Sequence, residues 1–209
     1  MMFVLPPIYP ITDKKLANRP THLSILKDLV RGGAELVQVR DKHTPASELL
    51  PDLVQCVEFC SVRKVRLIVN DRCELALSSG AAGVHLGQED VPPEEARAVL
   101  GPESIIGFSA HSLAQVRGCQ HRHIQYIGFG PVYATATKGD AAPAAGLDGL
   151  ARACRASSIP VAAIGGIGFD QIRQALDAGA ASVAVISALM TAPDIAREME
   201  RFLERARAK

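Results

Sequence analysis

The sequence predicts an α/β fold consisting of a single (β/α)₈ TIM barrel. Eight short runs rich in β-branched residues alternate with helical patterns along the 209 residues, which is the repeat of that barrel. No linker or change of composition divides the chain, so we expect one domain over residues 1–209. An open doubly wound sheet competes, but Thr12 and Asp13 follow the first strand where that fold carries a glycine-rich fingerprint.

The expected strands are short apolar runs bounded by turn or helix-start residues. They cover residues 8–12, 36–40, 66–70, 83–86, 104–109, 126–130, 160–164 and 183–186. Helical patterns fill the segments between them, and a charged helix completes the chain.

Several helix ends carry recognisable caps. Thr21 and Ser24 can each cap the helix after the first strand, and Ser112 can cap the helix after the fifth. Gly80 ends the helix after the third strand, and Asp170 is expected to cap the helix after the seventh strand.

Composition narrows the possible partners. Hydrophobic residues make up 48% and charged residues 22%, with a formal net charge of +1. That balance gives no general field for nucleic acid or an anionic membrane, so any anion binding must be local. No apolar run reaches a membrane-spanning length, and residues 1–10 do not resemble a signal peptide. The five cysteines are scattered, which predicts free thiols in a reducing cytoplasm.

Cationic and amide side chains end the second strand. Gln38, Arg40 and Lys42 alternate, which places them on one side of an extended chain. Because the active site of a barrel lies at the carboxyl ends of its strands, these three groups predict an anion site. The alternative is a structural ion pair with Asp41 or Glu74.

Carboxylates end the third and fourth strands. Asn70 and Asp71 close the third strand, and Asp90 follows the fourth. Two carboxylates at adjacent strand ends predict a Mg²⁺ site, since Mg²⁺ takes one or two protein carboxylates and completes its shell with water and phosphate oxygens. Asp71 and Asp90 can instead be helix caps or salt-bridge partners.

The remaining strand ends add hydroxyls, a histidine and glycines. Ser109 ends the fifth strand; His111 beside it can carry a proton or simply bond to backbone, and His85 is expected to pack. Thr135, Thr137 and Lys138 follow the sixth strand and suit a phosphate, although a polar surface loop is the alternative. The last two loops supply Gly165, Gly166, Ile186 and Ser187, where barrels often bind phosphate.

Together the strand ends offer two anion sites with one metal site between them. No Ser-His-Asp or Cys-His arrangement for covalent catalysis is evident. Such a rim suits departure of a diphosphate with attack by a second, phosphorylated small molecule.

Six segments, in order along the chain, resemble the thiamine phosphate synthase family. They are Tyr9-Pro10-Ile11-Thr12-Asp13, Val37-Gln38-Val39-Arg40-Asp41-Lys42, Val69-Asn70-Asp71-Arg72, Gly83-Val84-His85-Leu86-Gly87-Gln88-Glu89-Asp90, Tyr126-Ile127-Gly128-Phe129-Gly130-Pro131 and Ala163-Ile164-Gly165-Gly166-Ile167. The resemblance implies a (β/α)₈ barrel that condenses 4-amino-2-methyl-5-(diphosphooxymethyl)pyrimidine with hydroxyethylthiazole phosphate, giving thiamine phosphate and diphosphate by dissociative, magnesium-assisted departure of the diphosphate.

The resemblance also implies a role for each matching residue. Ser109, Lys138 and Arg40 would be catalytic, and Asp71 and Asp90 would bind Mg²⁺. The pyrimidine diphosphate would be held by Gln38, Arg40, Lys42, Asn70, Ser109 and Lys138, and the thiazole phosphate by Thr135, Thr137, Gly166, Ile186 and Ser187.

Two other functions stay open at this point. A sister branch of the same fold consists of thiazole tautomerases, in which His111 would move the proton, although that branch generally lacks the paired aspartates. A non-catalytic barrel that binds thiamine precursors is the third reading. The alanine-rich residues 139–149 are expected to form a flap, and the sequence leaves a homodimer open.

Overall fold

The computed structural model describes residues 3–119, 123–135 and 143–208, and its strands form one closed barrel. Each strand pairs in parallel with the next along the chain, and the last returns to the first, so the predicted (β/α)₈ barrel is confirmed. The strands are β1 (Ile8–Thr12), β2 (Leu36–Val39), β3 (Arg66–Asn70), β4 (Gly83–Leu86), β5 (Ile105–Ala110), β6 (Tyr126–Phe129), β7 (Val161–Ile164) and β8 (Ser182–Val185).

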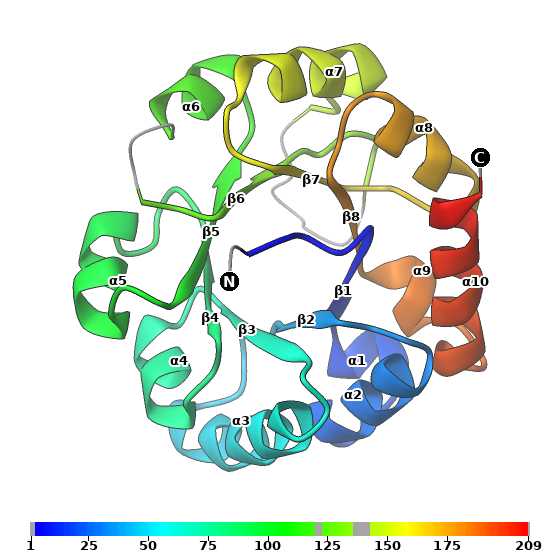
Figure 1. Ribbon diagram of the computed structural model, residues 1–209. Coiled ribbons are helices and arrows are strands. Elements are labelled where there is room, and N and C mark those ends of the chain that lie inside the picture. The colour runs from blue at the N-terminus through cyan, green and yellow to red at the C-terminus, as the bar shows by residue number, and fades with distance from the viewer. Residues whose placement is uncertain (1–2, 120–122, 136–142, 209) are drawn as a thin grey trace.

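The helices form a ring outside the strands (Figure 1). They are α1 (Lys14–Ala17), α2 (His22–Arg31), α3 (Ala46–Ser61), α4 (Cys73–Ser79), α5 (Pro93–Leu100), α6 (Leu113–Gly118), α7 (Gly146–Ala156), the 3₁₀ turn η1 (Phe169–Gln171), α8 (Ile172–Asp177), α9 (Ser187–Met190) and α10 (Ile195–Arg207). Within the described residues, none of them is both long and apolar enough to cross a membrane.

Local caps explain several helix boundaries. The Thr21 hydroxyl accepts from the Ser24 amide, so Thr21 is the N-cap of α2 and Ser24 lies in its first turn. Ser112 caps α6 in the same way, and Gly80 ends α4 in the left-handed region.

Asp170 does not cap a helix, contrary to the prediction. The chain turns through η1 first, and the Gln171 side chain accepts from the Gly168 amide across that turn. This local hydrogen bond moves the start of α8 to Ile172. The expected flap is also shorter: residues 139–142 lie outside the described residues, and α7 begins at Gly146.

The hydrophobic core has two parts, because side chains alternate between the two sides of each strand. The larger part lies between the strands and the helices. The smaller part fills the barrel and comprises Leu5, Tyr9, Ile11, Leu36, Ile68, Ile105, Tyr126, Ala162 and Ala184. The interior is uneven: large rings come from β1 and β6, while β7 and β8 contribute alanines.

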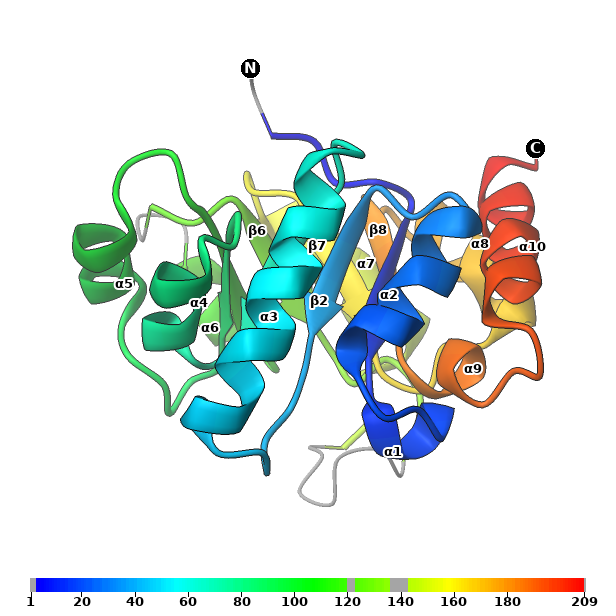
Figure 2. The same ribbon diagram turned by 90° about the horizontal axis from the view of Figure 1, so that it is seen from below.

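The two ends of the barrel differ. Figure 2 shows the N-terminal segment crossing one end, while α1 and the loop after β2 lie at the other. The Phe3 ring lies 6.1 Å from the Tyr126 ring, so the N-terminal segment packs against the barrel interior. The carboxyl ends of the strands open at the opposite end, where a barrel places its functional residues.

Candidate functional site

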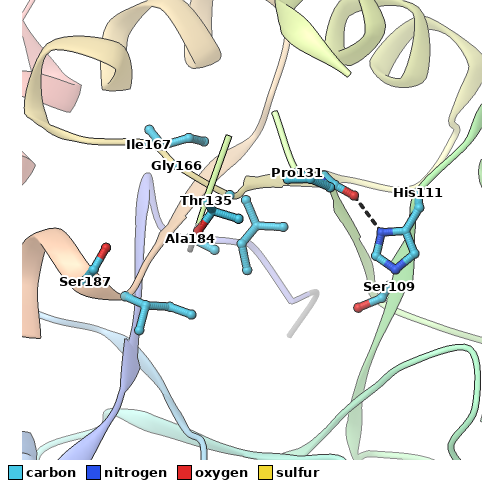
Figure 3. Close-up of a pocket in the computed structure, with 12 residues that line it drawn as sticks. Ser109, His111, Pro131, Thr135, Gly166, Ile167, Ala184 and Ser187 are labelled. Carbon is cyan, nitrogen blue, oxygen red and sulfur yellow. Dashed lines mark hydrogen bonds between the residues drawn. The ribbon is translucent and has the colours of Figure 1, made fainter. Parts of the chain in front are cut away.

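A pocket opens among the carboxyl ends of β5 to β8 (Figure 3). It contains about 630 Å³ of empty space including its mouth. Its lining residues are Ser109, His111, Gly130, Pro131, Thr135, Ile164, Gly165, Gly166, Ile167, Ala184, Ile186 and Ser187. The structure therefore brings together four predicted thiazole-phosphate residues, namely Thr135, Gly166, Ile186 and Ser187.

A second cavity lies in the barrel interior and adjoins the pocket. Its empty space is about 370 Å³, and it shares Ile164, Ala184 and Ile186 with the pocket. Its other lining residues are Tyr9, Ile11, Gln38, Arg40, Asn70, His85, Tyr126, Gly128 and Ala162. Three predicted pyrimidine-diphosphate residues, Gln38, Arg40 and Asn70, thus line a cavity that adjoins the pocket.

The glycines after β7 allow two loops to approach closely. Gly165 and Gly166 have φ values of +98° and +64°, in the region that favours glycine. A Cβ on Gly165 would lie 2.5 Å from the Pro131 Cβ, and one on Gly166 would lie 2.9 Å from the Tyr133 Cβ. These glycines therefore bring the β6 and β7 loops together at the pocket.

The three residues from the end of β2 do not act as one set. Gln38 is buried and donates to the Tyr9 hydroxyl at 2.9 Å. An Arg40 Nη1 lies 3.8 Å from an Asp13 carboxylate oxygen, while its Nε is buried without a partner among the described residues. Lys42 lies 3.4 Å from Asp71. Because β2 ends at Val39, the strand alternation does not extend to Lys42.

The alternative of an ion pair with Asp41 or Glu74 is not what the structure shows for these cations. Asp41 pairs with Lys14 at 3.0 Å, and Glu74 pairs with Arg72 at 3.2 Å. Asp41 also accepts from the Thr44 hydroxyl and from the amides of residues 43 and 44. Burial alone would raise the pKa of Asp41, but these donors outweigh it and hold its pKa well below the ordinary value.

The Asp71 and Asp90 carboxylates are close enough for the charge of Asp90 to act on Asp71, which is the proximity that a shared metal site requires. Burial first, and then the Asp90 carboxylate, raise the pKa of Asp71, while Lys42 opposes the shift. Neither aspartate caps a helix, because α4 and α5 have no side-chain cap. Asp90 instead accepts from the Gly87 amide at 2.6 Å.

The donor chemistry of this aspartate pair fits Mg²⁺. No group of three or more His, Cys, Asp or Glu side chains with metal-binding geometry occurs among the described residues, which disfavours a site built entirely from protein ligands. Mg²⁺ needs only one or two protein carboxylates, because water and phosphate oxygens complete its coordination. Two neighbouring carboxylates beside Lys42 suit such an open site.

Ser109 and His111 both line the pocket, and each is held by a partner. The Ser109 hydroxyl lies 3.0 Å from His85 Nε2. His111 Nδ1 lies 2.6 Å from the Gly130 carbonyl oxygen (Figure 3). The structure thus shows the predicted bond to backbone, and it places His111 at the pocket.

The sequence did not predict two residues that line the interior cavity, and two predicted site residues lie outside the described part of the chain. Tyr9 and Tyr126 line the interior cavity, and the alternation of Tyr126 with Gly128 in β6 and Gly130 just after it was the available signal. Thr137 and Lys138 lie outside the described residues.

Known proteins resemble this chain over most of its length. The family model described as thiamine monophosphate synthase matches residues 8–189. The thiamine-phosphate synthase of Azorhizobium caulinodans is 37% identical over 203 residues and that of Methanospirillum hungatei 41% over 198, covering 96% and 94% of this chain and 96% of each relative. A thiamine phosphate pyrophosphorylase structure from Pyrococcus furiosus has 33% identity and a TM-score of 0.87, with 97% of both chains covered. The chain belongs to the thiamine monophosphate synthase family.

Proposed function

We propose that this chain is a thiamine-phosphate synthase, a transferase that joins the pyrimidine diphosphate to hydroxyethylthiazole phosphate. Family membership supports the reaction. The observation that carries it for this chain is that the interior cavity and the pocket adjoin and share Ile164, Ala184 and Ile186 in their linings. Arg40 and Asn70 line the interior cavity, and Gly166 and Ser187 line the pocket, so two phosphorylated substrates would each have a site beside the other.

The proposed mechanism breaks the bond between the pyrimidine methylene carbon and the diphosphate oxygen first. The electron pair leaves with the diphosphate, and the thiazole nitrogen lone pair then forms the new C–N bond. Arg40 and Lys42, with Lys138, would stabilise the charge that accumulates on the leaving group. The buried Arg40 Nε, which has no partner among the described residues, supports this role.

Asp71 and Asp90 would hold one Mg²⁺, which supplies positive charge that neutralises the departing diphosphate. Lys42 beside Asp71 favours the ionised carboxylate and offsets part of the rise in its pKa. The apolar residues Ile164, Ala184 and Ile186, shared by the two cavities, would exclude water from the methylene carbon after the bond breaks. We place the reaction in the cytoplasm, because the five cysteines form no disulfide within the described residues.

Turnover of both substrates, followed by diphosphate release with Mg²⁺ present, tests this proposal. Asp71→Asn and Asp90→Asn should each lower kcat by at least about 100-fold, because metal-ion stabilisation is worth several kcal/mol and about 1.4 kcal/mol corresponds to tenfold. Asp170→Asn is the matched control, since Asp170 is exposed and caps no helix. Near-normal turnover of both site variants at saturating Mg²⁺ would remove the metal assignment, and no turnover of the unaltered chain would remove the function.

A further inference from the structure

A chain of five hydrogen-bonded side chains crosses the barrel interior and ends at Ser109 in the pocket. Gln38 Nε2 lies 2.9 Å from the Tyr9 hydroxyl, which lies 2.7 Å from the Tyr126 hydroxyl. The Tyr126 hydroxyl lies 3.0 Å from His85 Nδ1, and His85 Nε2 lies 3.0 Å from the Ser109 hydroxyl. The five residues come from β2, β1, β6, β4 and β5, so the chain spans most of the barrel.

Packing holds these groups in place. The His85 and Tyr126 rings stack with centroids 5.4 Å apart, and Tyr9 meets Tyr126 edge-on at 5.6 Å. Gly107 leaves the space for this arrangement, because a Cβ there would lie 2.5 Å from His85 Nδ1 and would overlap the Tyr126 ring. All four interior members are at most 9% exposed.

The chemistry of the first member fixes the direction of the chain. The Gln38 amide nitrogen only donates, so the Tyr9 oxygen accepts and its hydrogen points to Tyr126. Tyr126 then donates to His85 Nδ1. Burial raises the pKa of both tyrosines, so both keep the hydrogens that they donate.

The same direction of donation sets the tautomer of His85 and the orientation of the Ser109 hydroxyl. His85 accepts at Nδ1, so its neutral ring carries the hydrogen on Nε2 and donates to the Ser109 oxygen. In the reverse arrangement Tyr9 would face two donors, Gln38 and Tyr126, with no acceptor for its own hydrogen in these contacts. In the forward order the one hydroxyl hydrogen without an acceptor in these contacts belongs to Ser109 at the pocket, whereas in the reverse order it belongs to the buried Tyr9.

We propose that these five hydrogen-bonded side chains orient the Ser109 hydroxyl so that its hydrogen points into the pocket. There the hydroxyl donates to an oxygen of the leaving diphosphate. This rests on the proposed function. Negative charge grows on that oxygen as the bond breaks, so a donor there binds the transition state more tightly than the substrate. A serine that instead donated to His85 would present lone pairs to the same charge. His85, Tyr126 and Tyr9 are therefore positioning residues for the coupling reaction.

The histidine form can be measured without turnover. In ¹⁵N-histidine-labelled protein at mildly alkaline pH, the His85 ring nitrogens should show hydrogen on Nε2 and a bare Nδ1, with His85→Gln assigning the signals. Tyr126→Phe, which removes the donor to Nδ1, should abolish the preference for that form. Hydrogen on Nδ1 in the unaltered chain would overturn the proposal, whatever the activity.

Kinetics test the effect on the reaction. Tyr126→Phe should lower kcat about tenfold with little change in KM for the pyrimidine diphosphate, a factor typical of one hydrogen bond lost in the transition state. Tyr133→Phe is the matched control, because its hydroxyl bonds to Gln174 on the surface. His85→Gln, which can still donate to Ser109, should retain more turnover than His85→Leu.

Equal turnover of His85→Gln and His85→Leu, or unchanged kcat in Tyr126→Phe, would contradict the positioning role. Failure of the proposed function itself would look different, because the unaltered chain would then release no diphosphate while the His85 form could still be read.

Discussion

At the scale of single residues, the hydrogen bond that a side chain already makes limits what it can do for a substrate. His111 is the clearest case. The Gly130 carbonyl can only accept, so His111 Nδ1 carries a hydrogen and Nε2 is the nitrogen that can act as a base toward the pocket. The coupling reaction asks for no such base, because breaking the diphosphate bond moves no proton.

We therefore expect His111→Ala to lower coupling turnover by less than about tenfold, whereas a reaction that used His111 as a general base would lose about 10²–10⁴-fold. The measurement is diphosphate release with both substrates, alongside tautomerisation of the thiazole phosphate by NMR. A coupling defect of a hundredfold or more with unchanged substrate affinity would give His111 a catalytic part.

The residue scale also shows what the sequence can predict. Alternation correctly put Gln38 and Arg40 on one side of β2, and both line the interior cavity. It could not predict that Gln38 would bond to Tyr9, because that contact depends on the register between β1 and β2, in which Ile11 pairs with Gln38. Lys42 lies beyond the end of β2, so strand alternation could not predict its ion pair with Asp71 either.

At the scale of elements, local cap signals predicted the starts of α2 and α6 but not the start of α8. Thr21 and Ser112 begin α2 and α6 as expected, since a cap involves residues three apart. The glycines of β5 and β6 are different. Gly107 and Gly128 are needed by the His85 and Tyr126 rings, which reach them from other strands, so only the assembled barrel explains them.

Gly107→Ala should consequently destabilise the fold by about 1–3 kcal/mol, the usual cost of overpacking a filled interior. Gly118→Ala serves as the comparison: it lies at the end of α6 with nothing within 4 Å of a new Cβ, and should be neutral or slightly stabilising. Urea unfolding midpoints at constant m-value measure both. Equal midpoints in the two variants would mean that the His85 and Tyr126 rings have room to move.

At the scale of the whole molecule, the β1–β8 pairing and α10 join the two ends of the chain. Ile8 pairs with Val183, and α10 packs against α2 and α8. Because the barrel closes only when its last strand meets its first, partial folding leaves unpaired edges.

We expect one cooperative unfolding transition, as predicted for a single domain over residues 1–209. The chain has three tyrosines and no tryptophan, so tyrosine fluorescence reports mainly the barrel interior while far-UV circular dichroism reports the helices. The two curves should coincide. Phe202 is a buried ring of α10, so Phe202→Ala should lower the free energy of unfolding by about 3–5 kcal/mol in both measurements. Phe59 is half-buried on α3, so Phe59→Ala should lower it less. Separate transitions would contradict a single cooperative unit.

The hydrogen-bonded chain through the barrel also determines where the gene can be cut. A cut after Gly101 would leave Tyr9, Gln38 and His85 in one fragment and Ser109 and Tyr126 in the other, so only the Gln38–Tyr9 contact would survive within a fragment. Each half would carry polar rings whose partners are encoded in the other half. Fragments divided at this point should have no turnover when separate and should regain it only when they are brought together. Such a pair could serve as a complementation reporter of molecular proximity.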